Sequence, residues 1–138
     1  DGHGYVLGDA SLQASPHGWG SAAVLAYHTH QADRLVAEVN NGGEMVELTI
    51  RTVDVAVSYK AVHASRGKRT RAEPVAALYE QKRVHHVGGL AKLEDEMCSW
   101  SAIEGEPSPN RMDALVWALT ELMLDVPRGV EHGPDLWT

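Results

Sequence analysis

A short apolar segment that ends in a carboxylate and a pair of glycines constrains the fold of this chain most. Leu35, Val36 and Val39 are residues of the kind that fill buried strands, and Glu38 stands among them. The pair Gly42-Gly43 then ends the segment sharply. Burying a glutamate in a strand is costly unless a partner compensates its charge, and a divalent cation is one such partner. The alternative is a glutamate at a strand end that points to water.

Strand and helix signals alternate along the chain, which is typical of an α/β domain. We predict strands over residues 5–10, 34–39, 55–62 and 84–87, and helices over residues 16–29, 43–52, 70–81, 90–100 and 110–124. We expect one mixed sheet in which the 34–39 strand is central, with helices on both faces. The length suits a single domain, 1–138, with a loosely ordered tail from about residue 125. A turn signal at residues 1–4 with no strand before it indicates that opening hairpin strands are missing.

Two of the predicted helices have recognisable start signals. Ser15 is a good N-cap, and Pro16 suits the first helical position. Thr70 and Glu73 have the spacing of a capping box. The basic residues just before Thr70 are therefore expected to form a loop.

The composition excludes several classes of function. A formal net charge of −7 argues against a general nucleic-acid coat, and no segment is long and apolar enough to span a membrane. Cys98 is the only cysteine, so an internal disulfide is impossible. The chain has neither G-x-x-x-x-G-K-[ST] nor G-x-S-x-G, which argues against ATP hydrolysis and against a serine hydrolase.

The predicted loop reverses the acidic character of the chain locally. It holds Arg66, Lys68, Arg69 and Arg71 within six positions. Such a cluster favours contact with the phosphates of a nucleic acid rather than with its bases. The alternative is a solvated loop.

A second carboxylate, Asp113, stands one turn into the last predicted helix, beside its apolar stripe. We expect this carboxylate and Glu38 to converge in one open cleft at the end of the central strand. Convergent carboxylates can hold one or two Mg²⁺ or Mn²⁺ ions for phosphodiester hydrolysis. Taken alone, Asp113 is better explained as an acidic residue that favours the positive end of the helix dipole.

Several linked motifs, taken in this order, resemble the C-terminal nuclease domain of the large terminase subunit of tailed phages and prophages. The resemblance covers the chain from about Tyr5 to Leu124. The matching segments are residues 36–43 (VAEVNNGG), 65–68 (SRGK), 71–75 (RAEPV), 84–88 (VHHVG), 93–97 (LEDEM) and 108–118 (SPNRMDALVWA).

The resemblance implies a ribonuclease-H-like fold and a two-metal endonuclease that cuts concatemeric viral DNA during packaging. It implies a cluster of acidic catalytic residues, the first of which lies on an opening strand with no match here. The second maps to Glu38, and the third maps to the start of the last helix. The family often reads S-P-D-R-x-D-A there, whereas this chain has Asn110 in place of the first aspartate and keeps Asp113. Because the two positions share a helix face, either can point at the metals, and we favour Asp113.

The resemblance also implies partners and a location. The partners are double-stranded DNA, the ATPase domain of the same full-length chain, the small terminase subunit and the portal. The expected location is the cytoplasm of the bacterial host, without membrane association. We expect residues 1–138 alone to cleave DNA inefficiently, since the opening-strand aspartate is not among them.

Two other functions remain open at the level of sequence. A catalytically impaired module that binds DNA or the portal is favoured by Asn110 and by the missing first strand. A related resolvase or integrase is the third possibility, and the matches at residues 71–75 and in the last helix argue against it.

Overall fold

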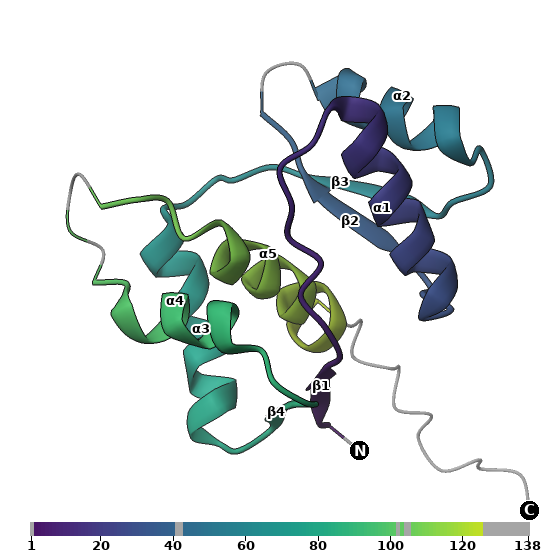
Figure 1. Cartoon of the computed structure of the whole chain (residues 1–138). Coiled ribbons are helices and arrows are strands. Elements are labelled where there is room, and N and C mark those ends of the chain that lie inside the picture. The colour runs from purple at the N-terminus through teal and green to yellow at the C-terminus, as the bar shows by residue number, and fades with distance from the viewer. Residues whose placement is uncertain (1, 41–42, 102, 104–105, 126–138) are drawn as a thin grey trace, which may run out of the picture.

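The computed structural model describes residues 2–40, 43–101, 103 and 106–125, and it has mixed α/β architecture (Figure 1). The predicted tail lies outside these residues, apart from its first residue. Across the described part of the chain, no helix has the length and apolar character needed to cross a membrane. In chain order the elements are β1 (Gly4–Val6), α1 (Pro16–Thr29), β2 (Leu35–Glu38), α2 (Gly43–Val53), β3 (Tyr59–Val62), α3 (Lys68–Glu80), β4 (Val84–His86), α4 (Ala91–Ser99), α5 (Asn110–Leu119) and a π-helical turn, η1 (Thr120–Leu124).

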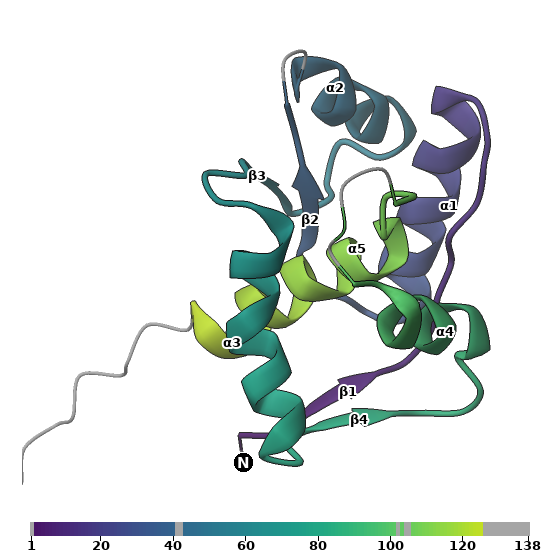
Figure 2. The ribbon, with the colours of Figure 1, turned by 90° about the vertical axis from the view of Figure 1, so that its left-hand side faces the viewer.

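The strands form two separate parallel pairs, β1 with β4 and β2 with β3 (Figure 2). The prediction of one mixed sheet with a central 34–39 strand is therefore wrong for the described residues. A pair of strands has no interior strand, so in the described part of the chain one edge of β2 has no strand beside it. The N–H groups of Leu35 and Val39 donate to the carbonyls of Ser58 and Val62 on the β3 side. Since alternate residues of a strand point their backbone groups to opposite edges, those of Val36 face the other way.

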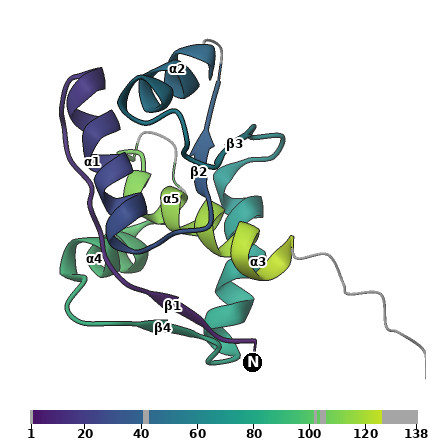
Figure 3. The same cartoon turned by 90° about the vertical axis from the view of Figure 1, so that its right-hand side faces the viewer.

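Helices nevertheless cover both faces of the β2–β3 pair, as predicted. Helices α1 and α2 pack on one face, and α5 contacts β2 from the other. Figure 3 shows α5 between this pair and helix α3. Helix α5 therefore has a strand pair on one side and other helices on the opposite side.

Two distinct cores hold the elements in place. The larger one, which we call the α5 core, joins β1, α3, β4, α4 and α5. Its buried residues are Val6, Val75, Leu78, Val84, Leu90, Leu93, Leu115, Val116 and Leu119. The predicted apolar stripe of the last helix supplies three of these residues, which confirms that part of the prediction.

The smaller core, which we call the α1–α2 core, lies under the β2–β3 pair. Its buried residues are Val24, Ile50 and Val57, and Trp19, Ala23, Tyr27, Leu35, Val53 and Tyr59 pack around them. The start of α1 is as predicted, because the Ser15 hydroxyl accepts a hydrogen bond from the Gly18 N–H and Pro16 is the first helical residue. Met45 and Leu48 of α2 point away from this core and are exposed.

The structure corrects several predicted boundaries, and strand β1 ends at Val6 rather than at residue 10. Strand β3 begins at Tyr59, because residues 54–57 form a turn that places Val57 in the α1–α2 core. Helix α3 begins at Lys68 with Gly67 as its N-cap, so the Thr70 capping box is wrong. The last cations of the basic segment therefore occupy the first helical turn rather than a loop.

Candidate functional site

Strand alternation decides which way Glu38 points. Successive side chains of a strand point to opposite faces, so Glu38 and Val36 share one face and Leu35 takes the other. Leu35 packs on the α1–α2 core, whereas Val36 and Glu38 line a cavity in front of α5. The glutamate therefore leaves the strand end towards α5 rather than into the small core.

Asp113 is held in the first turn of α5, which is capped from outside the helix. Pro109 precedes the helix and has no side chain able to cap it. The Glu96 carboxylate of α4 accepts a hydrogen bond from the Met112 N–H at 3.0 Å and so satisfies one free donor of the first turn. The Asp113 side chain is 12% exposed, so it sits at a nearly buried position on a fixed helix end.

Arg71 lies against both carboxylates. Its Nη2 atom donates to Asp113 Oδ1 at 2.6 Å and lies 3.9 Å from Glu38 Oε2. The two carboxylates thus meet at one guanidinium nitrogen, and the predicted convergence of Glu38 and Asp113 is observed. Their role as metal ligands stays a prediction.

Arg71 is itself fixed by its surroundings. Its Nη1 donates to the Arg66 carbonyl at 2.7 Å, and its guanidinium lies 5.0 Å from the ring centroid of Trp117. Only 10% of the side chain is exposed, and Nε is buried with no hydrogen-bond partner among the described residues. A buried donor without a partner is unfavourable. The attraction of the two carboxylates must therefore outweigh this cost for Arg71 to stay in this position.

Lys68 reaches the same carboxylate from one turn earlier in α3. Its ammonium group donates to the Ser108 hydroxyl and lies 3.7 Å from Asp113 Oδ2. Because Lys68 and Arg71 are three residues apart, the helix presents both on one face. Arg66 and Arg69, by contrast, are exposed. The predicted phosphate-binding set therefore divides into two inward-pointing and two outward-pointing cations.

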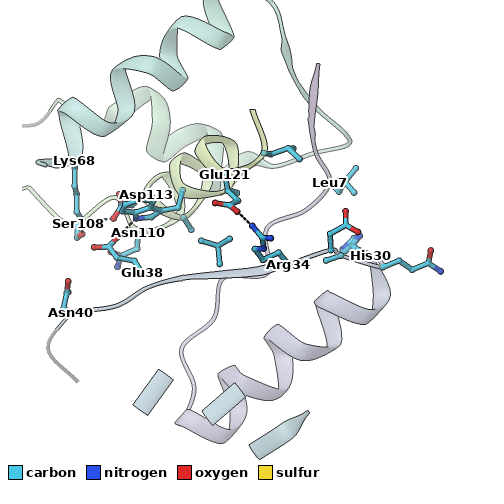
Figure 4. Close-up of a pocket in the computed structure, with 18 residues that line it drawn as sticks. Leu7, His30, Arg34, Glu38, Asn40, Lys68, Ser108, Asn110, Asp113 and Glu121 are labelled. Atoms are coloured by element: carbon cyan, nitrogen blue, oxygen red, sulfur yellow. Dashed lines mark hydrogen bonds and ion pairs between the residues drawn. The ribbon is translucent and has the colours of Figure 1, made fainter. Parts of the chain in front are cut away.

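The carboxylates open into a cavity of about 1130 Å³ that residues of β2 and α5 line together. Figure 4 shows Glu38, Asp113, Asn110, Ser108 and Lys68 gathered at one end of it. Arg34 and Glu121 stand towards the opposite end. An ammonium group, an amide and a hydroxyl therefore lie beside the two carboxylates at their end of the cavity.

A comparison with known protein families matches residues 5–124 to the Terminase RNaseH-like domain. The chain belongs to this family. Neither the search of curated proteins nor that of solved structures found a match. The described α/β architecture, with its small parallel sheets, is consistent with a ribonuclease-H-like fold. Membership supports a nuclease or terminase-related role.

The donor set of this terminase domain fits a hard divalent cation, the kind of ion that ribonuclease-H-like nucleases generally use. Glu38 and Asp113 supply carboxylates, and the Asn110 and Ser108 side chains add neutral oxygens at the same cavity. Mg²⁺ typically binds one or two carboxylates and keeps several waters, so this set is sufficient for one ion. Across the described residues, no group of three or more His, Cys, Asp or Glu side chains could hold a metal.

The glycine that follows β2 is closely packed. Gly42 lies outside the described residues, and Gly43 starts α2. A Cβ atom on Gly43 would lie 2.8 Å from the Val39 Cβ. The space at Gly43 is therefore filled by Val39 rather than left for a ligand.

Sequence reasoning missed the importance of Trp117 in this terminase domain. Its indole Nε1–H donates to Glu38 Oε2 at 2.7 Å. The signal was present, because Trp117 follows Asp113 by four residues and so lies on the same helix face. The inward turn of Arg71 could have been inferred from its spacing to Lys68, had the helix start been placed correctly.

Proposed function

We propose that this domain is the metal-dependent endonuclease of a DNA-packaging terminase, which cuts concatemeric double-stranded DNA. The observation that carries the proposal is the meeting of Glu38 and Asp113 at one end of an open cavity in a chain of this family. Glu38 and Asp113 would hold Mg²⁺ or Mn²⁺, with Asn110 as a neutral neighbour and two ions as the full complement. Bound there, the metal would polarise a phosphate oxygen and activate water for hydrolysis.

The cations of α3 would serve the DNA rather than the metal. Arg71 and Lys68 lie beside the carboxylates and could move to the anionic phosphate once a metal ion neutralises Asp113. Arg66 and Arg69 are exposed next to the same helix start, where they would contact the DNA backbone. In this arrangement the inner pair acts at the cut phosphodiester and the outer pair positions the duplex.

The remaining partners follow from the same proposal. The domain would work together with the terminase ATPase domain of the full-length chain, the small terminase subunit and the portal. It would do so in the cytoplasm of the infected bacterial host.

Nicking of supercoiled plasmid by the full-length protein tests the proposal. We expect cleavage that requires Mg²⁺ or Mn²⁺ and that is abolished by Glu38→Gln and by Asp113→Asn. The controls are Glu80→Gln and Asp95→Asn, which change exposed carboxylates outside the cavity. Cleavage that survives both site variants would contradict the assignment.

A second candidate is a module that binds DNA or the portal without cutting. Asn110 in place of the usual aspartate and the ion pair between Arg71 and Asp113 favour it. Plasmid binding without nicking at any divalent metal concentration would support this alternative.

The salt dependence of DNA binding tests the outer cations. Replacing Arg66 and Arg69 by alanine should reduce the slope of log affinity against log salt by about one unit for each lost phosphate contact. An unchanged slope would assign both side chains to solvent.

A further inference from the structure

Glu38 is oriented by a single strong hydrogen bond. Trp117 donates its indole N–H to Oε2 at 2.7 Å, and the nearest Arg71 nitrogen lies 3.9 Å from the same oxygen. Both contacts therefore fall on Oε2. Among the described residues no hydrogen bond or ion pair holds Oε1, so this is the oxygen that remains available in the cavity.

Trp117 is placed to act on the site as a whole. It follows Asp113 by one helical turn, so both side chains lie on one face of α5. That face therefore carries the Asp113 carboxylate and the indole that orients Glu38. The face of the same indole lies against the guanidinium of Arg71 at 5.0 Å, a favourable cation–π distance. One side chain thus fixes Glu38 and supports the arginine that contacts Asp113.

The bond also crosses between the two cores. Glu38 ends a strand that packs on the α1–α2 core, whereas Trp117 stands on the helix at the centre of the α5 core. Trp117 belongs to neither set of packed core residues. Its contacts point to a function in the cavity rather than to filling of a core.

We propose that Trp117 is a positioning residue for the divalent-metal site. By holding Oε2, its N–H group fixes the rotamer of Glu38 and turns Oε1 towards the space next to Asp113. This inference rests on the proposed function, because it assumes that Glu38 binds a metal ion. Partners that hydrogen-bond to a ligating carboxylate typically affect metal affinity by 10–100-fold, which sets the expected effect.

Calorimetric titration of Mn²⁺ into the full-length protein tests the inference without measuring cleavage. Two variants remove the donor in different ways. Trp117→Phe removes it together with part of the ring, whereas benzothienylalanine at position 117 replaces the N–H by sulfur and keeps the ring shape. We expect both variants to weaken Mn²⁺ binding by roughly 10–100-fold. The control is Trp19→Phe, which changes an indole that packs on the α1–α2 core and should leave the affinity unchanged.

The outcomes separate this inference from the proposed function. If the protein binds Mn²⁺ and Glu38→Gln weakens that binding, but the benzothienylalanine variant binds normally, the positioning role of Trp117 is wrong and the metal site stands. An effect of Trp117→Phe alone would likewise overturn it, since ring volume would then be the cause. No Mn²⁺ binding, or binding that is indifferent to Glu38→Gln, would overturn both.

Discussion

The two cores hold the two carboxylates of the site unequally. The α5 core buries nine aliphatic residues from five elements, and it fixes the helix that carries Asp113. The α1–α2 core buries three, and it supports the strand that ends at Glu38. Since burying one such side chain stabilises the fold by about 1.5–3 kcal/mol, Asp113 stands on the more strongly anchored half.

Polar contacts, rather than a shared apolar layer, join the two halves at the site. Trp117 bonds to Glu38, and Glu121 of η1 pairs with Arg34 and with Lys60 of the β2–β3 region. Such contacts are individually weak next to core packing. Glu38 and Asp113 therefore stand on two separately packed halves that a few polar groups join near the site.

The largest expected effect is a loss of stability caused by a substitution in the α5 core. Leu119→Ala should lower the free energy of unfolding by about 2–5 kcal/mol, because it leaves a cavity beneath α5. Chemical denaturation measures the loss. Leu122→Ala is the control on the next turn, where the side chain is 60% exposed, and it should stay within about 0.5 kcal/mol. Equal effects of the two variants would show that α5 is not anchored as described.

Gly43→Ala tests the smaller half next to Glu38. The added methyl would lie 2.8 Å from the Val39 Cβ, which is part of a stiff side chain, so overpacking should cost about 1–3 kcal/mol. Hydrogen exchange should show lost protection in β2 and α2 and unchanged protection in α5. The matched control is Gly67→Ala, since nothing lies within 4 Å of a methyl there. Protection lost equally in α5 would mean that the halves unfold as one unit.

Alkaline pH should weaken the fold through its partly buried tyrosines, because burial raises the pKa of both Tyr79 and Tyr59. Burial raises the pKa of Tyr79 to about 12, and the nearby charge of Glu94 adds to it. An unfolded tyrosine ionises near pH 10, so this contribution to stability is complete below pH 10 and is lost as the pH rises towards 12. Tyr79→Phe should remove that slope.

At neutral pH the Tyr79→Phe variant should lower the free energy of unfolding by about 0.5–1.5 kcal/mol. The reason is the loss of the hydrogen bond between the Tyr79 hydroxyl and His86 Nε2, which is 2.7 Å long. Tyr59→Phe is the comparison in the α1–α2 core. Its hydroxyl has no hydrogen-bond partner among the described residues, so its removal should cost less. Thermal unfolding at neutral and alkaline pH measures both variants, and the reverse ranking would contradict the assignment.

The smallest expected effect concerns the polar bridge between the halves. Glu121→Gln should cost about 0.2–1 kcal/mol, as expected for a partly exposed carboxylate with two cations. The hydrogen bond from Lys60 holds the pKa of Glu121 below its ordinary value, and Arg34 lowers it further. This contribution is therefore present above about pH 4.5 and is lost as the pH falls through the lowered value.

Denaturation of the Glu121→Gln variant over acidic pH measures this contribution. The variant should show a flatter acid dependence than the wild type, and Glu44→Gln, an exposed change on α2, should not. If the stability of the wild type and of the Glu121→Gln variant depends on acidic pH in the same way, the ion pairs of Glu121 do not stabilise the fold.

The sequence by itself determined the features that depend on local spacing. Ser15-Pro16 specified the start of α1, and the 3.6-residue period of Leu115, Val116 and Leu119 specified the buried face of α5. The alternation of strands and helices determined the α/β class. Glu38 and Asp113 were assigned to the correct elements, a strand end and a helix start, whereas their approach was only an expectation.

Only the tertiary structure decided which groups meet across the chain. The arrangement of strands as two parallel pairs depends on backbone partners far apart in sequence, such as Gly4 with Val84. The bond between Trp117 and Glu38 joins residues 79 positions apart, and no local pattern encodes it. Arg71 was expected in a loop that either contacts phosphates or lies in solvent, but a helix that begins at Lys68 turns it inward. The reason is electrostatic, since two converging carboxylates at a partly buried position favour a nearby cation between them.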